Sequence, residues 1–251
     1  MEGTRDLAGG LPAIRGEWEA HLTVGCPPSG VEALAAWAER HGHGFVHIVL
    51  ARGATPSQPM VNLSGLGPLA GAGREVAGVA AQLANDGYPL TRVKIETTPW
   101  AHGVPTHDAA AGSDHRDRYF EHHVKLLLAP DHDRPSLERL AVAHGAHLSR
   151  NARRVRADGA EERFVTQRCA GVGSSSAARR LAALLDALAV ASVPHRVVEV
   201  EREYVAHDSN LALDDGWLTA AAAPDVRGTR EARGTREAQE GSTVTEGTTT
   251  P

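Results

Sequence analysis

Trp18-Glu19-Ala20-His21-Leu22-Thr23-Val24 is the stretch that decides the fold, because its pattern recurs roughly a hundred residues later as Phe120-Glu121-His122-His123-Val124-Lys125-Leu126. Both runs read aromatic, Glu, any residue, His, apolar, polar, apolar. Polar and apolar side chains alternate in each run, which is the period of a strand with one buried face. The repeat predicts a tandem duplication in which each copy opens on a strand that carries a Glu-x-His pair.

The segments that follow the two opening strands also match in order. Apolar spacing and Gly or Pro punctuation predict a helix, two strands, a second helix and a last strand in each copy. In the first copy we expect these elements at 31–41, 45–50, 59–63, 73–85 and 89–96. In the second copy we expect them at 136–144, 146–150, 163–169, 175–191 and 194–201. The order is βαββαβ twice, so we predict an α+β protein built as a tandem duplication of a ferredoxin-like module.

Composition shifts set the expected domain boundaries. Residues 101–117 are rich in Gly, Pro, Ala and His, which is typical of an exposed linker, and the end of the chain has few apolar residues. We expect a flexible amino terminus at 1–14, repeat 1 at 15–100, the linker at 101–117, repeat 2 at 118–212 and a disordered tail at 221–251.

The bulk composition narrows the classes of partner. The 251 residues are 41% hydrophobic and 23% charged, with a formal net charge of −5, which gives no reason to expect nucleic acid as a partner. No apolar run approaches the roughly 18 to 20 residues that span a bilayer, so no membrane partner is expected. The start of the sequence lacks a basic, apolar leader, and the cytoplasm is the expected location. The sequence does not indicate an oligomeric state.

Strand parity places the polar residues of both copies on one face of each sheet. Residues two apart on a strand share a face, and the two helices of a ferredoxin-like module cover the other face. The polar face is then expected to carry Glu19, His21, Thr23, Arg92, Lys94 and Glu96 in the first copy, and Glu121, His123, Lys125, Glu199, Glu201 and Glu203 in the second. The third strands are expected to add Asn62 and Ser64 in the first copy, and Thr166 and Arg168 in the second. Both lysines of the chain belong to this set. We therefore expect two four-stranded antiparallel sheets that face each other across a shared polar cleft.

Histidines flanked by carboxylates, with lysines nearby, are typical of proton transfer. The first hypothesis is an enzyme, with hydrolysis one candidate reaction, that acts by acid/base catalysis on a small anionic molecule such as a phosphorylated one. The expected catalytic residues are His21, His123, Glu19, Glu121, Lys94 and Lys125. The expected ligand-binding residues are Thr23, Glu96, Arg168, Glu201, Gly171 and Gly173, the two glycines because the turn before a helix presents N–H groups to an anion. The rival hypothesis is a non-catalytic module that binds a metabolite or a protein.

Two partial resemblances to known families add further alternatives. His21, Glu96, His123 and Glu201 form a symmetric set that resembles the duplicated modules of the vicinal oxygen chelate metalloenzymes, which implies a divalent metal as cofactor. His21-Leu22-Thr23 is similar to the His-x-Thr/Ser motif that each lobe of the 2H phosphoesterases carries, which implies two histidines acting as base and acid. In the second copy Lys125 stands where that motif has its hydroxyl.

Overall fold

The computed structural model describes residues 7–112, 117–154 and 156–217. The first module contains β1 (Arg15–Val24), η1 (Pro28–Gly30), α2 (Val31–Arg40), β2 (Gly44–Leu50), β3 (Ser57–Pro68), α3 (Leu69–Asn85) and β4 (Leu90–Thr97), preceded by α1 (Leu7–Gly10). The short helix α4 (Asp108–Ala111) lies between the modules. The second module contains β5 (Tyr119–Leu128), α5 (Arg134–Ala143), β6 (Ala146–Asn151), β7 (Glu161–Ala170), α6 (Ser174–Ala189), β8 (His195–Asp208) and η2 (Leu211–Asp214).

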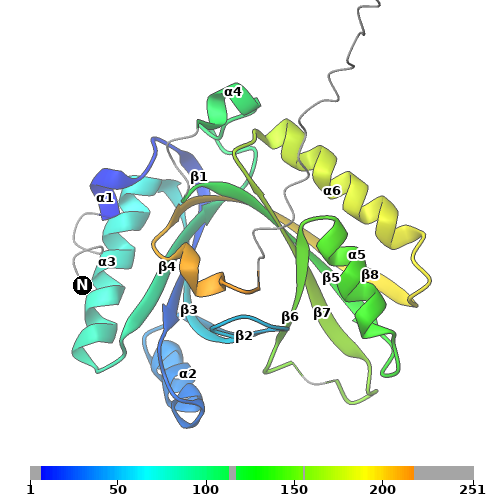
Figure 1. Ribbon diagram of the computed structural model, residues 1–251. Coiled ribbons are helices and arrows are strands. Elements are labelled where there is room, and N and C mark those ends of the chain that lie inside the picture. Colours follow the sequence, from blue (N-terminus) through cyan, green and yellow to red (C-terminus); the bar gives the residue numbers. More distant parts are fainter. Residues whose placement is uncertain (1–6, 113–116, 155, 218–251) are drawn as a thin grey trace, which may run out of the picture.

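Strand pairing confirms the tandem ferredoxin-like modules. The first module pairs its strands in the order β4-β1-β3-β2, and the second pairs its strands in the equivalent order β8-β5-β7-β6. The two sheets also pair edge to edge, β2 with β6 and β4 with β8, all antiparallel. The result is one closed barrel of eight strands, with the main helices on its outside (Figure 1). The two polar faces therefore meet inside a barrel, and not across a gap between separate sheets.

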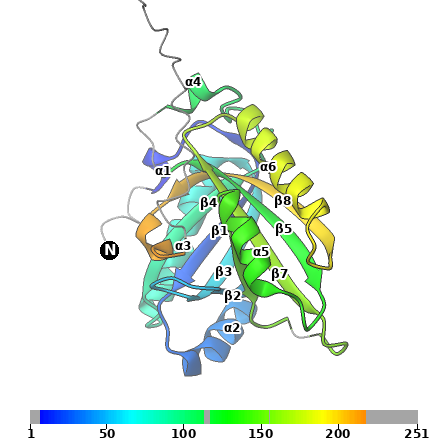
Figure 2. The same ribbon diagram turned by 45° about the vertical axis from the view of Figure 1, so that its right-hand side comes forward.

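Burial along the strands follows the predicted parity. Ala20, Leu22, Val93 and Ile95 point to the helices and are at most 2% exposed. They belong to a core that α2 and α3 complete on the first module, and a second core under α5 and α6 contains Val124, Leu126, Val165 and Leu184. Because these alternate residues pack against the helices on the outside of the barrel, the polar residues between them point into its interior. Figure 2 shows α5 and α6 lying over the strands of the second module.

The largest differences from the predicted bounds are in β3 and β8. β3 continues to Pro68, beyond the predicted end at 63, and Gly65 and Gly67 belong to it and pair with β1. Gly65 lies opposite Trp18, and a Cβ at Gly65 would be 2.4 Å from the Trp18 ring, so the glycine provides room for the indole on a continuous strand. The last strand was expected to end at Glu201, but β8 continues to Asp208, and this extension makes the contact with β4.

The chain ends lie partly within the described residues. α1 packs on α3, and Leu7 and Ile14 are buried, although residues 1–14 were expected to be flexible. The predicted disordered tail at 221–251 lies outside the described residues. Among the described residues, no helix has the length and apolar character needed to cross a membrane.

Residues that follow β8 cross one mouth of the barrel. The side chain of Asn210 donates to the Thr91 carbonyl, the Ala54 N–H donates to the Asp215 carbonyl, and the Trp217 indole donates to the Leu148 carbonyl. This segment thus runs from the start of β4 past the β2–β3 loop to β6, and Figure 1 shows it in orange within the ring of strands. It closes that end and contributes Asp214 to the interior.

Candidate functional site

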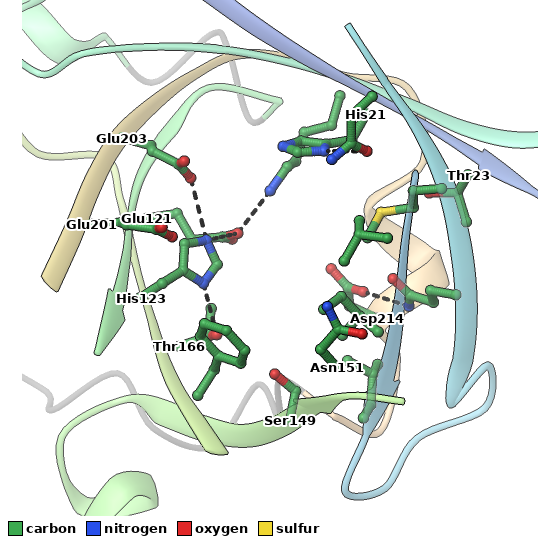
Figure 3. A pocket seen from close by; sticks show the side chains of 18 of the residues that line it. His21, Thr23, Glu121, His123, Ser149, Asn151, Thr166, Glu201, Glu203 and Asp214 are labelled. Carbon is green, nitrogen blue, oxygen red and sulfur yellow. Dashed lines mark hydrogen bonds and ion pairs between the residues drawn. The ribbon is translucent and has the colours of Figure 1, made fainter. Parts of the chain in front are cut away.

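The interior of the barrel is a polar cavity of about 290 Å³. All eight strands and η2 contribute side chains to it, so neither module forms the cavity alone (Figure 3). Its polar lining residues include both Glu-x-His pairs and both lysines of the chain. A cavity of this size accommodates a small metabolite, since ligand pockets usually begin at roughly 300 Å³.

His123, on β5, is held as a charged imidazolium. Its Nε2 lies 3.3 Å from a Glu121 oxygen and 3.2 Å from a Glu203 oxygen, and its Nδ1–H donates to the Thr166 hydroxyl at 3.0 Å. Burial alone would lower the pKa of His123, but the bonds to the two carboxylates outweigh burial and raise it to about 10. His123 therefore carries a positive charge at neutral pH.

His21, on β1, is the equivalent residue of the first module, and it is neutral. Its Nδ1 lies 3.1 Å from the Asn62 amide oxygen, so that nitrogen carries the proton, and its Nε2 is 3.8 Å from Glu96. Burial, and next the positive charge of Lys94, lower the pKa of His21 to about 4. The unprotonated Nε2 can accept a hydrogen bond or a proton from a ligand.

Lys94 connects the two modules in the centre of the cavity. Its ammonium donates to Glu121 at 2.8 Å and forms an ion pair with Glu96, which is 1% exposed. Burial alone would raise the pKa of Glu121, but Lys94, Arg168 and His123 hold it well below its usual range. Glu121 is thus a permanent carboxylate that fixes three cations.

A network of buried ion pairs fills the end of the cavity under η2. Arg92 is 6% exposed and bonds Asp208 with its Nε at 2.9 Å and Asp214 with its Nη1 at 3.3 Å. Arg168 bridges Asp214, at 2.8 Å, and Glu121, at 3.0 Å. The Tyr119 hydroxyl donates to Asp208 at 2.7 Å. Because every member has a partner, this network can remain charged without water.

The cavity opens beside the first half of β8. β4 pairs with β8 only from Tyr204 to Asp208, so the preceding residues of β8 have one unpaired edge. Glu199 and Glu201 lie on this half, line the cavity and are exposed. Lys125 faces the same region at 3.8 Å from Glu199 and 3.6 Å from Glu162.

The structure brings together most of the residues that the sequence singled out. His21, His123, Glu19, Glu121, Lys94, Lys125, Thr23, Arg168 and Glu201 line the cavity, and Glu96 lies directly behind Lys94. The catalytic and ligand-binding roles assigned to these residues from the sequence stay predictions.

The two glycines proposed as anion ligands are elsewhere. Gly171 and Gly173 lie between β7 and α6 and do not line the cavity. The Gly173 N–H donates to the Asp108 carboxylate at 2.9 Å, and the Ser176 hydroxyl donates to the same side chain. The anion at this helix start is thus a residue of the chain itself, which corrects the expectation of a ligand there.

Several cavity residues were missed by the sequence reasoning. Asp214 and Trp217 follow the last strand, where no periodic pattern indicates a position inside the barrel. Arg92 and Glu203, in contrast, were expected on the polar faces from strand parity, and both line the cavity. Asn62 on β3, also expected on this face, lines the cavity and accepts a hydrogen bond from Nδ1 of His21.

A divalent metal does not fit the residues present. The predicted set of His21, Glu96, His123 and Glu201 does not converge; among the described residues, the group close enough to share an ion is Glu121, His123 and Glu203. In that group His123 holds its proton between two carboxylates, and Glu121 is bonded to two further cations, Lys94 and Arg168. A bound metal would have to displace that proton next to Lys94 and Arg168.

Comparison with known proteins identifies no relative. No family model matches the chain, and no curated protein matches it. Among solved structures, the acetolactate synthase small subunit from Thermotoga maritima is similar at 14% identity, with 76% of this chain and 94% of that chain covered and a TM-score of 0.27. The ligand-free regulatory subunit of aspartate kinase from Thermus thermophilus is similar at 13% identity, covering 71% and 98%, with a TM-score of 0.27. Likeness this distant carries no argument about function.

Proposed function

We propose that the protein binds a small polar metabolite inside the barrel. The observation that carries this proposal is the interior itself, because a cavity of about 290 Å³ receives side chains from all eight strands. Two of its buried polar atoms are free to bond a ligand: the Thr23 hydroxyl has no hydrogen-bond partner among the described residues, and Nε2 of His21 is an unprotonated acceptor. Buried polar groups without partners are costly unless a ligand or water satisfies them.

Filling the cavity tests this proposal. Met60 on β3 lines the cavity, and Leu66 on the same strand is 81% exposed, so Met60→Trp blocks the interior while Leu66→Trp adds the same indole outside. We expect equilibrium dialysis against a small-molecule cell extract, read by mass spectrometry, to show a compound retained by the parent and by Leu66→Trp but not by Met60→Trp. Retention by all three proteins, or by none, would contradict binding in the barrel.

Acid/base catalysis is the second candidate, and the unlike protonation of the two histidines favours it. A neutral His21 and a charged His123 in one cavity could serve as base and acid toward the same ligand. We expect a catalyst to convert the retained compound over many turnovers, and His21→Ala and His123→Ala each to abolish conversion while binding persists. If the retained compound stays intact during incubation with excess parent protein, catalysis is contradicted and only the binding function remains.

A further inference from the structure

The cavity has unpaired carboxylates near its opening. Glu19 on β1 and Glu201 on β8 line the cavity, and no cation of the described residues lies within ion-pair distance of either carboxylate. Glu203, two residues from Glu201 on the same face of β8, pairs with His123 and with no other cation of the described residues. Figure 3 shows Glu201 and Glu203 on the same side of the cavity as Glu121. Burial, and next the charges of Glu203 and Glu201, raise the pKa of Glu19, and burial raises that of Glu201.

The cations of the cavity, in contrast, are already neutralised. Each is paired with carboxylates of the chain: Arg92 with Asp208 and Asp214, Lys94 with Glu96 and Glu121, Arg168 with Glu121 and Asp214, Lys125 with Glu162 and Glu199, and Arg154 with Glu162. An anionic ligand would have to break one of these pairs and leave a buried carboxylate without its partner, which is strongly unfavourable.

The central network is also short of positive charge. Its cations are Arg92, Lys94, His123 and Arg168, and its carboxylates are Glu96, Glu121, Glu203, Asp208 and Asp214. Four positive charges thus face five negative ones, before Glu19 and Glu201 are added. A cation that entered the cavity would offset this excess in a poorly solvated site, where charge pairing is stronger than in water.

We propose that the ligand is an organic cation, a primary amine or a guanidinium, whose charged end lies among Glu19, Glu201 and Glu203. This inference rests on the proposed binding function, and it reverses the expectation of an anionic ligand. Among the described residues, Glu19 and Glu201 belong to no group of three ligands close enough to share one small ion, so a ligand that spreads its charge over several donors suits them better. A guanidinium spreads five donors over a planar fork and can reach carboxylates on separate strands, and an ammonium can donate to one or two of them. The free Thr23 hydroxyl and Nε2 of His21 can bond the remainder of the ligand.

Three probes with one carbon skeleton test the sign of the ligand charge. Pentane-1,5-diamine, pentane-1,5-diol and glutarate, each at a series of concentrations up to about 20 mM at pH 7, are compared by calorimetry and by thermal shift of the full chain. We expect the diamine to bind and to raise the melting temperature, and glutarate to do neither. Glu19→Gln and Glu201→Gln should each weaken diamine binding about ten-fold, the loss of one charge-assisted hydrogen bond. Glu39→Gln, on the exposed side of α2, should leave it unchanged.

The outcomes separate this inference from the proposed function. Tighter binding of glutarate or of the diol than of the diamine overturns the proposal of a cationic ligand, but it is compatible with a metabolite cavity. The same conclusion follows if manganese chloride, added as a fourth probe, raises the melting temperature and the diamine does not. No binding of any probe also overturns it, and the dialysis experiment then decides on the cavity independently. A measurement without ligand gives a second test: Glu19→Gln and Glu201→Gln should each raise the melting temperature at pH 7, and the gain should vanish near pH 4, where both carboxyl groups are protonated in the parent. A lower melting temperature at pH 7 in both variants overturns the claim of unpaired charge.

Discussion

Replacing His123 by Gln should change the stability of the protein in a way that depends on pH. In the folded chain His123 holds its proton between Glu121 and Glu203, whereas in the unfolded chain it releases that proton near the usual 6.5. A pKa that folding raises contributes stability that is complete below pH 6.5 and is lost as the pH rises through about 10. His123→Gln should therefore be much less stable than the parent at pH 6.5 and nearly equal to it at pH 10.

The structure sets the size of the effect. Raising the pKa of His123 from 6.5 to about 10 corresponds to at most about 5 kcal/mol of unfolding free energy, at 1.36 kcal/mol for each pH unit. The imidazole is 20% exposed, and solvent screens part of the attraction, so about 3 kcal/mol is a realistic expectation. This loss already includes the weaker neutralisation of Glu121 and Glu203 in the variant, because their attraction for the proton is what raises the pKa of His123.

Urea unfolding of parent and variant at pH 6.5, 8 and 9.5 measures this difference. His122→Gln is the matched control, because His122 is the next residue on β5, is buried, and bonds Gln167 at 3.0 Å. Burial lowers the pKa of His122, so it is neutral in the folded and the unfolded chain above pH 6.5. Its stability difference from the parent should change by less than about 0.5 kcal/mol between pH 6.5 and 9.5, because at pH 6.5 only the unfolded chain still binds part of a proton. If the stability difference between His123→Gln and the parent changes as little with pH as that of the control, then His123 is not held as an imidazolium by its two carboxylates, and the reasoning is refuted.

Two other substitutions test the packing and the buried ion pairs. Gly65→Ala should lower the unfolding free energy by about 1 to 3 kcal/mol, because its methyl group would overlap the Trp18 ring. Gly78→Ala in α3, where nothing lies within 4 Å, should instead raise it by roughly 0.5 to 1 kcal/mol; a loss of similar size in both variants would contradict the role of the indole. Arg92→Met keeps the volume but leaves Asp208 without its cation, and urea unfolding at pH 7 should show a loss of about 3 to 5 kcal/mol. A loss under about 1 kcal/mol would mean that this ion pair is dispensable.

The module and the face of each strand could be predicted because both follow from local periodicity. The alternation that starts at Trp18 places Ala20 and Leu22 under the helices and His21 inside the barrel, and the second copy repeats the pattern. Burial of the apolar face fixes the register of such strands, since a slip by one residue would expose every core side chain. The sequence therefore predicts the polar interior as soon as the repeat is found.

Closure of the barrel could not be predicted, because it depends on which edge strands pair with each other, and the alternation of polar and apolar residues along a strand does not show this. β2 and β6 pair over only Ile48, Val49 and Leu50, and β4 meets β8 across an irregularity between Ile95 and Glu96. Nothing in the alternation of these strands shows which edge stays free. The same holds for Asp214, whose position depends on the path of a segment outside any strand.

The charge of the expected ligand also depends on pairings that the sequence does not show. From the sequence, Lys94 and Arg168 stand among alternating charges and could bind an anion. In the structure both donate to Glu121, one from each module. A lysine or arginine on the correct face is thus available to a ligand only when no carboxylate of a neighbouring strand has taken it.

Joining the modules in one chain removes a constraint that two identical chains would impose. In a barrel of two identical subunits, a two-fold axis would repeat every interior residue, and the two histidines would have the same surroundings. Here His21 lies opposite Asn62 and His123 lies opposite Thr166, and one imidazole is neutral while the other is charged. The side of the cavity formed by the first module therefore differs in charge from the side formed by the second module. A ligand with one charged and one neutral end would bind in a single orientation, which a symmetric barrel could not enforce.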